Sequence, residues 1–206
     1  MASLVGLVVC VVLFLALLGA SVSLFVLDFL GVMPRWLSVL LGLQEEAMQE
    51  QKRRIVGFTG TRIGLTDRQK VALNEVLLAR WPLELHHGDC EGGDETAHCL
   101  CDSKGNAAVL HPPKCDEFRA FCSSLVAVGG YDSVTILPAD EYLVRDEAIV
   151  RDVEELVACP REHTGERVRS GTWTTVRRAR AKGIPITIIR PDGSVKVEPA
   201  RDRQAT

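Results

Sequence analysis

Residues 86–101, which read HHGDCEGGDETAHCLC, hold three histidines, three cysteines, four acidic residues and three glycines. Such a stretch could hold a metal ion, form a catalytic cluster or build a turn around a ligand. Zinc sites usually pair their ligands as Cys-x2–4-Cys or His-x3–5-His. Cys99 and Cys101 are only two residues apart, which would place them on different sides of a helix. We therefore expect no metal here. We expect His86 and His87 to end a strand and the two cysteines to pack as small apolar residues.

Two further stretches have the composition of anion-binding turns. Residues 57–62 (GFTGTR) follow a short apolar run, and residues 169–175 (RSGTWTT) open a predicted helix. Small residues let backbone N–H groups approach a phosphate, and Arg62 can neutralise its charge. The alternative for each stretch is an ordinary tight turn or helix cap. Two such turns in one predicted sheet favour a ligand.

The elements that would position these stretches alternate between strands and helices. Apolar runs predict strands at 55–59, 83–87, 107–110, 153–159 and 184–189, and the intervening patterns predict helices from residue 66, up to residue 104, at 142–151 and at 171–182. Residues 114–141 are interpreted as a short helix and a loop. The alternation predicts an α/β, Rossmann-like parallel sheet with helices on both faces. Ligands bind beyond the carboxyl ends of such strands, where all three stretches fall.

The N-terminal region predicts a membrane attachment. Residues 4–27 carry no charge, and as a helix they would span about 36 Å, enough to cross a hydrocarbon core of roughly 30 Å. We expect a transmembrane anchor at 1–28 and an amphipathic juxtamembrane segment at 29–53. Arg35 and the basic residues 52–54 follow the anchor, which places the C-terminal domain in the cytoplasm. A cleaved signal peptide and a misassigned start codon are the alternatives.

Charge and cysteine content limit the partners of the remaining chain. Residues 52–206 hold 23 basic and 23 acidic residues, so the domain has no general attraction for nucleic acid. Seven cysteines at irregular spacing fit a reducing compartment with free thiols. A local basic cluster is the exception; it contains Arg161, Arg167, Arg169, Arg177, Arg178, Arg180 and Lys182.

The pattern Gly88-x3-Gly92-x-Asp94-x2-Ala97-His98 resembles the second-strand loop of the DNA-processing protein DprA. DprA belongs to the SLOG superfamily of Rossmann-like proteins, together with the lonely-guy phosphoribohydrolases. Residues 142–150 (YLVRDEAIV) are similar to the superfamily's Arg-Asn-x-x-Ile helix, with Asp146 where Asn is usual. Residues 170–172 (SGT) resemble its Gly-x-Gly-Thr or Ser-Gly turn. With HPP at 111–113 and RAFC at 119–122, the set looks closest to the YpsA-related SLOG branch.

The resemblance covers residues 54–193 and implies a pocket for a nucleotide or nucleotide-derived phosphorylated ligand. The tail at 194–206 is predicted to be disordered. Asp89 and Asp94 would line or brace the pocket. The ligand-binding residues that the resemblance and the turns together predict are Gly60, Thr61, Arg62, Gly88, Asp89, Gly92, Gly93, Asp94, Arg145, Ser170, Gly171 and Thr172.

Three functions agree with these observations. The first is a membrane-anchored cytoplasmic SLOG domain that binds such a ligand as a sensor or regulator. The second is a nucleotide N-glycosidic-bond hydrolase; however, the phosphoribohydrolases carry a catalytic Glu three residues after the Thr of their turn, and this chain has Thr175 there. The third is a DprA-like binder of single-stranded DNA. The neutral charge of the domain and the anchor disfavour nucleic acid as a partner. The sequence does not identify catalytic residues or a cofactor, and it is compatible with a homo-oligomer.

Overall fold

The computed structural model describes residues 52–102, 106–124 and 133–201. The chain divides into two units, 1–51 and 52–206, and only the second is described. The predicted anchor at 1–28 and nearly all of the predicted juxtamembrane segment at 29–53 lie outside the described residues. Within the described part, none of the helices combines the length and the hydrophobicity needed to span a bilayer.

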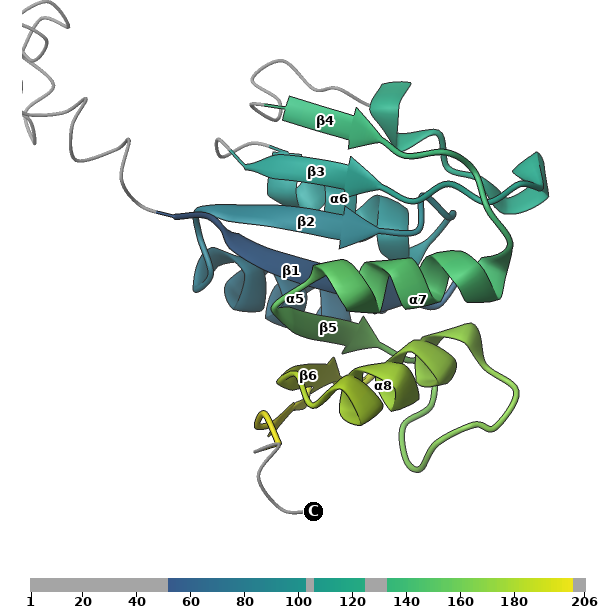
Figure 1. Cartoon of the computed structure of the whole chain (residues 1–206). Helices are drawn as coiled ribbons and strands as arrows, with labels where there is room; N and C mark the ends of the chain where they lie inside the picture. The colour runs from purple at the N-terminus through teal and green to yellow at the C-terminus, as the bar shows by residue number, and fades with distance from the viewer. Residues whose placement is uncertain (1–51, 103–105, 125–132, 202–206) are drawn as a thin grey trace, which may run out of the picture. The chain divides into compact units, whose positions relative to one another are not determined.

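A seven-stranded sheet forms the centre of the second unit, in the order β4-β3-β2-β1-β5-β6-β7 (Figure 1). Strands β1 to β6 pair in parallel, and β7 pairs antiparallel to β6. The strands are β1 (Arg54–Gly60), β2 (Leu83–His87), β3 (Ala107–Leu110), β4 (Ser133–Ile136), β5 (Glu155–Cys159), β6 (Ile186–Ile189) and β7 (Val195–Glu198). The predicted α/β sheet with parallel strands is therefore confirmed.

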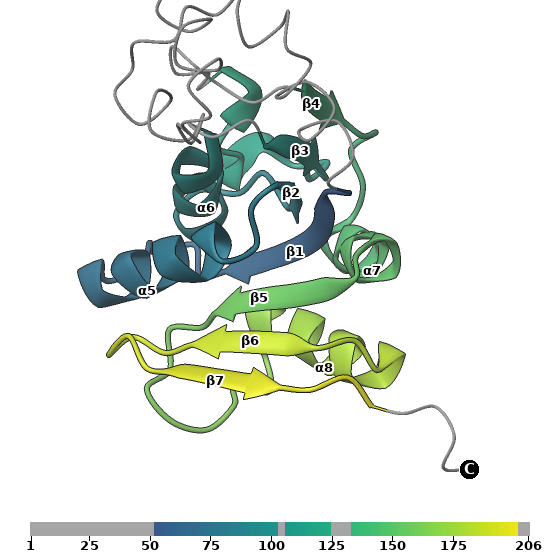
Figure 2. The same cartoon turned by 90° about the vertical axis from the view of Figure 1, so that its left-hand side faces the viewer.

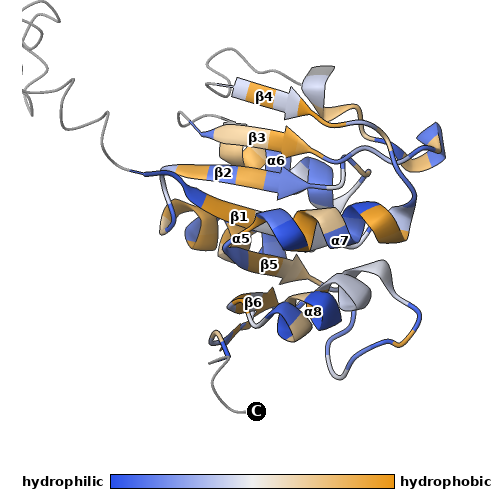
Figure 3. Ribbon diagram, in the orientation of Figure 1, coloured by the Kyte–Doolittle hydropathy of each residue, from blue (hydrophilic) through white to orange (hydrophobic). Residues whose placement is uncertain are grey.

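Four α-helices cover the two faces of this sheet. Helices α5 (Asp67–Leu78) and α6 (Gly93–Asp102) lie on one face, and α7 (Tyr142–Asp152) and α8 (Gly171–Lys182) lie on the other (Figure 2). One core packs α5 and α6 against the sheet around Phe58 and Leu85, and a second packs α7 and α8 around Trp173. The two cores form because the strands are largely apolar and each helix carries both apolar and polar residues, with the apolar ones packed on the sheet (Figure 3).

The order of connections creates a crevice between β1 and β5. The chain builds β2, β3 and β4 on one side of β1 and then returns through α7 to place β5 on the other side. The connections leaving β1 and β5 therefore go to opposite faces of the sheet. Ligands in open α/β sheets bind at such a topological switch point, beyond the carboxyl ends of the strands. In Figure 1 these ends face the loop between β5 and α8.

Local sequence signals fix the helix ends. Thr66 accepts a hydrogen bond from the Gln69 amide while the Gln69 side chain accepts from the Thr66 amide, which completes a capping box at α5. Ser170 caps α8, and Gly183 ends that helix with a φ of 81°. The predicted end of α6 at residues 104–105 lies outside the described residues; the described helix reaches Asp102.

Two strands differ from the sequence expectation. The segment 114–141 contains β4 and two 3-10 helices, Asp116–Phe118 and Cys122–Ser124. The predicted disordered tail contains β7, which a turn at residues 190–194 folds back onto β6. Both are short edge strands with largely exposed side chains. The apolar pattern used to find buried strands is weak in such segments.

Candidate functional site

A cavity of about 460 Å³ occupies the crevice at the carboxyl ends of β1 and β5. Four segments line it: the end of β1 with the turn after it (58–63), the β2–α6 loop, one face of α7, and the β5–α8 loop (residues 160–170) with the first turn of α8. Of the predicted site residues, the cavity lining includes Gly60, Thr61, Arg62, Gly88, Asp94, Arg145, Ser170, Gly171 and Thr172.

The three other predicted residues lie behind the lining and shape it. A Cβ atom at Gly93 would come within 2.7 Å of the Gly60 Cα, so the start of α6 touches the end of β1 backbone to backbone. Gly92 has a φ of 83°, and a Cβ atom there would lie 2.5 Å from the Arg62 carbonyl oxygen. Gly92 and Gly93 therefore allow the β2–α6 loop to pack closely against the turn after β1, and neither residue is part of the cavity lining.

Asp89 is fully buried and braces a neighbouring segment. Its backbone has a φ of 52°, a conformation that Asp tolerates better than most residues. Its carboxylate accepts hydrogen bonds from Arg119 Nε at 2.8 Å and from the Cys122 amide at 2.9 Å. We expected Asp89 either to line the pocket or to brace it. The structure shows the second role, because Asp89 connects residues 119–122 to the loop that follows β2.

The first turn of α8 lines the cavity and is open at Gly171. The leading N–H groups of a helix have no intrahelical acceptor, and the helix dipole makes this end positive. A Cβ atom at Gly171 would meet no atom within 4 Å. The Thr172 hydroxyl donates to the Gly60 carbonyl at 3.0 Å, which joins this turn to β1. Arg62 is exposed at the same cavity and stacks on the Phe118 ring at 4.4 Å.

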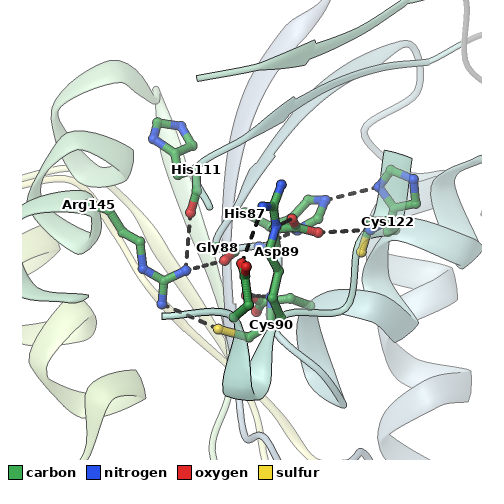
Figure 4. A network of polar contacts seen from close by, with 11 residues as sticks. His87, Gly88, Asp89, Cys90, His111, Cys122 and Arg145 are labelled. Atoms are coloured by element: carbon green, nitrogen blue, oxygen red, sulfur yellow. Dashed lines mark hydrogen bonds and ion pairs between the residues drawn. The ribbon is translucent and has the colours of Figure 1, made fainter. Parts of the chain in front are cut away.

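Arg145 is a buried cation at the inner end of the cavity (Figure 4). Its Nη1 donates to the Gly88 carbonyl and, at 3.1 Å, to the His111 carbonyl, while Nη2 lies 3.3 Å from Cys90 Sγ. Its Nε has no hydrogen-bond partner among the described residues. A Cβ atom at Gly88 would lie 2.6 Å from Arg145 Nη1 and 2.8 Å from Asp94 Oδ2. Any side chain at position 88 would therefore collide with Arg145 or Asp94, so this packing requires a glycine there.

Two carboxyl groups lie beside Arg145. Burial raises the pKa of Asp94 to about 7, and the Arg145 charge opposes that shift. Burial also raises the pKa of Asp146, which the charges of Arg145 and Arg178 and a hydrogen bond with Thr175 oppose. Asp146 was not among the predicted site residues, although its place at the usual Asn of the resembled helix pointed to it. Asp94, which ionises near neutral pH, could exchange a proton with a bound ligand, and Asp146 has a pKa shifted in the same direction.

The basic cluster predicted from the sequence separates into two groups. Arg161, Arg167 and Arg169 of the β5–α8 loop line the cavity. Arg169 opens the turn predicted at 169–175, whereas sequence reasoning did not assign Arg161 and Arg167 to the site. The cations of α8 are engaged within the fold. The acceptors are the Val168 carbonyl for Arg177, the Leu143 carbonyl for Arg178, Glu166 and Glu198 for Arg180, and the Val150, Arg151 and Val153 carbonyls for Lys182. The sequence signal for the first group was its position just before the Ser-Gly-Thr turn.

His87, His98 and Cys122 bring their donor atoms within 4.8 Å of one another in the described part of the chain. The hydrogen bonds determine whether a metal fits. The Asp89 amide donates to His87 Nδ1 at 3.2 Å, so the ring proton lies on Nε2, which faces His98 Nδ1 at 3.0 Å. A metal would need the Nε2 lone pair, and this tautomer does not provide it. The absence of a metal stays a prediction.

The cysteine expectation holds for one of the two residues. Cys101 is buried in the core between α6 and the sheet, as a small apolar residue would be. Cys99 is exposed, contrary to the expectation. The two residues lie on different sides of α6, which agrees with the spacing argument against a shared metal.

No known protein-family model matches the sequence, and no curated protein is significantly similar to it. Solved structures are similar in fold. A molybdenum cofactor binding protein from the phototrophic bacterium Rippkaea orientalis is 16% identical, with a TM-score of 0.50 over 68% of this chain and 78% of that chain. The protein TM1055 is 15% identical, with a TM-score of 0.44 over 65% and 72% of the two chains. The first likeness supports the Rossmann-like fold.

Proposed function

We propose that the chain is a membrane-anchored SLOG domain of the YpsA-related kind, which binds a nucleotide or nucleotide-derived phosphorylated ligand in the cytoplasm as a sensor or regulator. One observation carries the ligand class. The open turn at Gly171 and the exposed guanidinium of Arg62 border the same cavity at the switch point of the sheet.

The chemistry of these groups favours a phosphate. Free N–H groups at a helix start and an arginine together provide charge-assisted hydrogen bonds to an anion. Thr61 adds a hydroxyl group to the same lining, whereas the Thr172 hydroxyl donates to the Gly60 carbonyl and the Ser170 hydroxyl accepts from the Trp173 amide. Support for a small molecule also comes from the protein of Rippkaea orientalis, which shares the fold and is named for binding a molybdenum cofactor.

The inner end of the cavity favours hydrolysis as the second candidate function. Burial raises the pKa of both Asp94 and Asp146, and the Asp94 pKa of about 7 lets this carboxyl carry a proton near neutral pH. Thr175, at the position of the phosphoribohydrolase Glu, is buried and donates to the Gly171 carbonyl. A hydrolase built on this site would therefore need its acid from α6 or α7. Release of free base from a nucleoside monophosphate, lost in Asp146→Asn, would support this candidate.

Membrane attachment is proposed from the uncharged residues 4–27. Extraction of membranes with alkaline carbonate tests it, because a transmembrane anchor resists this treatment. Release of the intact chain, or a mature chain that begins near residue 21, would contradict the anchor. The DNA-binding alternative is not proposed, because the cations of α8 are engaged within the fold and the arginines of the β5–α8 loop line the cavity of a domain that is neutral as a whole.

Calorimetry tests the ligand proposal directly. The purified full chain is titrated with nucleoside mono- and diphosphates, nucleotide sugars and NAD. Arg62→Ala should weaken binding by roughly 1.5–3 kcal/mol, because it removes a charge-assisted hydrogen bond. Gly171→Val should abolish binding without unfolding the chain, since its side chain would enter the open space at the turn. Arg68→Ala, an exposed arginine of α5 outside the cavity lining, is the matched control.

The proposal fails if Arg62→Ala and Gly171→Val bind every compound as well as the wild type does. It also fails if the wild type binds none of them.

A further inference from the structure

We infer that the ligand carries at least two linked phosphate groups, one held at the first turn of α8 and the next held by the arginines of the β5–α8 loop. This inference rests on the proposed function, and it narrows the ligand class from phosphorylated compounds in general to diphosphates and longer chains.

The cations of the loop lack neutralising partners. Arg167 and Arg169 are exposed, line the cavity and make no side-chain hydrogen bond or ion pair within the described residues. Arg161, also in the lining, has only a long contact of 3.9 Å with Glu162. The lining also contains Asp94, Asp146 and Glu162, but none of these acids forms an ion pair with Arg167 or Arg169 among the described residues. Guanidinium groups that share a cavity and are not neutralised repel one another, and an anionic ligand would relieve this repulsion.

The acids of the same loop do not pair with Arg167 or Arg169. Glu162 Oε2 accepts from the Trp173 indole at 2.9 Å, while its Oε1 has no hydrogen-bond partner among the described residues and lies 3.9 Å from Arg161 Nε. Glu166 accepts from Arg180 at 2.6 Å. Arg180 in turn binds Glu198 of β7, so Glu166 is fixed away from the loop arginines. The positive charge of the loop is therefore local to the cavity, even though the domain as a whole is neutral.

The positive charge of the lining exceeds the charge of one phosphate. Arg62, Arg167 and Arg169 bring three positive charges to the lining, whereas a single phosphate monoester carries about −1.5 to −2 at pH 7. Arg167 and Arg169 lie in the loop just before the first turn of α8, so they can reach beyond a phosphate that is bound at that turn. A second phosphate would place new oxygens beside them. The guanidinium fork suits such oxygens better than a lysine would.

The test compares phosphate chain lengths on the full chain. Inorganic phosphate and pyrophosphate serve as probes without a base, and AMP, ADP and ATP serve as probes with one; calorimetry measures each affinity. The wild type should bind pyrophosphate and ADP at least tenfold more tightly than phosphate and AMP. The double variant Arg167→Ala/Arg169→Ala should remove this tenfold advantage and leave the weaker affinity for phosphate and AMP nearly unchanged. Arg68→Ala should keep the advantage.

The outcomes separate the inference from the proposed function. Equal affinities for mono- and diphosphates, or an advantage that survives in the double variant, would overturn the inference; loss of all binding in Gly171→Val would then leave the proposed function standing. If Gly171→Val binds every probe as the wild type does, or if the wild type binds no probe, both fail. If the double variant loses phosphate and pyrophosphate equally, the loop binds the first phosphate and the inference is wrong.

Discussion

Two polar regions lie side by side at the carboxyl edge of the sheet, and they differ in how their polar groups are paired. In the region behind β2, His87, Asp89, Arg119 and Cys122 form a closed network in which Asp89 accepts from two donors and His87 from one (Figure 4). In the cavity between β1 and β5, Arg167, Arg169 and the Arg145 Nε have no partner among the described residues.

This difference in pairing distinguishes polar groups that stabilise the fold from polar groups that could bind a ligand. Buried polar groups that satisfy one another stabilise the fold and leave nothing for a ligand. Polar groups that line a cavity without partners have hydrogen-bonding capacity left for one. The stretch with the densest chemistry in the sequence thus supports the fold more than it lines the cavity, and the arginine-rich loop after β5 provides the cavity with charge.

The largest expected effect is in the closed network. Asp89→Ala leaves the Arg119 guanidinium and the Cys122 amide without their acceptor, and we expect it to lower the free energy of unfolding by about 3 kcal/mol. Asp116→Ala removes the other, exposed partner of Arg119, at 3.5 Å, and should cost less than about 0.5 kcal/mol. Urea denaturation of the full chain measures both. Equal losses in the two variants would show that Asp89 is not a brace.

A second pair of variants compares two glycines of the cavity lining. Gly88→Ala forces a methyl group against Arg145 and Asp94, so the free energy of unfolding should fall by about 1–3 kcal/mol. Gly171→Ala places the same group in open space at the start of α8 and should leave the stability within about 0.5 kcal/mol of the wild type. If Gly88→Ala is as stable as Gly171→Ala, Arg145 does not have the packing described.

The pH dependence of stability should show a further effect, in which buried His111 and the cavity residue Asp94 act in opposite directions. Burial, with the charge of His86, lowers the pKa of His111 to about 4, so its contribution to stability is complete above pH 6.5 and is lost as the pH falls toward 4. The pKa of Asp94 is raised to about 7, so the folded chain keeps a proton that the unfolded chain loses, and this term stabilises the fold as the pH falls from 7 to 4. The two terms oppose each other in the wild type.

Asp94→Asn removes the acid and leaves the histidine term. Between pH 6.5 and 4 the variant should lose about 2–3 kcal/mol more of its free energy of unfolding than the wild type loses. Urea denaturation at several pH values gives both curves. Parallel curves would mean that Asp94 does not hold its proton in the folded chain.

Sequence reasoning predicted the central elements of the fold closely. The strands at 83–87 and 107–110 and the helix at 171–182 have the predicted bounds, because buried apolar runs and the Ser170 and Gly183 caps are local signals. The edge strands β4 and β7 were missed. Their pairing depends on a neighbouring strand that is distant in sequence or reached through a turn, and their exposed side chains carry little pattern.

The candidate site was predictable in part, for a similar reason. Small residues and Arg62 just after a strand identify a turn, so the β1 and α8 segments of the lining could be found. Whether a residue faces the cavity or stands behind it depends on packing between segments. The sequence placed Asp89 and Gly93 with the ligand-binding residues, although the first binds Arg119 and the second touches Gly60. The path of the β5–α8 loop over the cavity could not be read from its composition.

Native mass spectrometry of the full chain, purified without added nucleotide and then mixed with the compounds of the calorimetry panel, shows whether the cavity binds a phosphorylated ligand. The wild-type chain should carry a phosphorylated small molecule, either retained from the cell or taken from the panel. Gly171→Val should carry none, while Arg68→Ala should carry as much as the wild type. A wild-type chain without any such adduct, or equal occupancy in Gly171→Val and wild type, would contradict a phosphate-binding pocket at the switch point of the sheet.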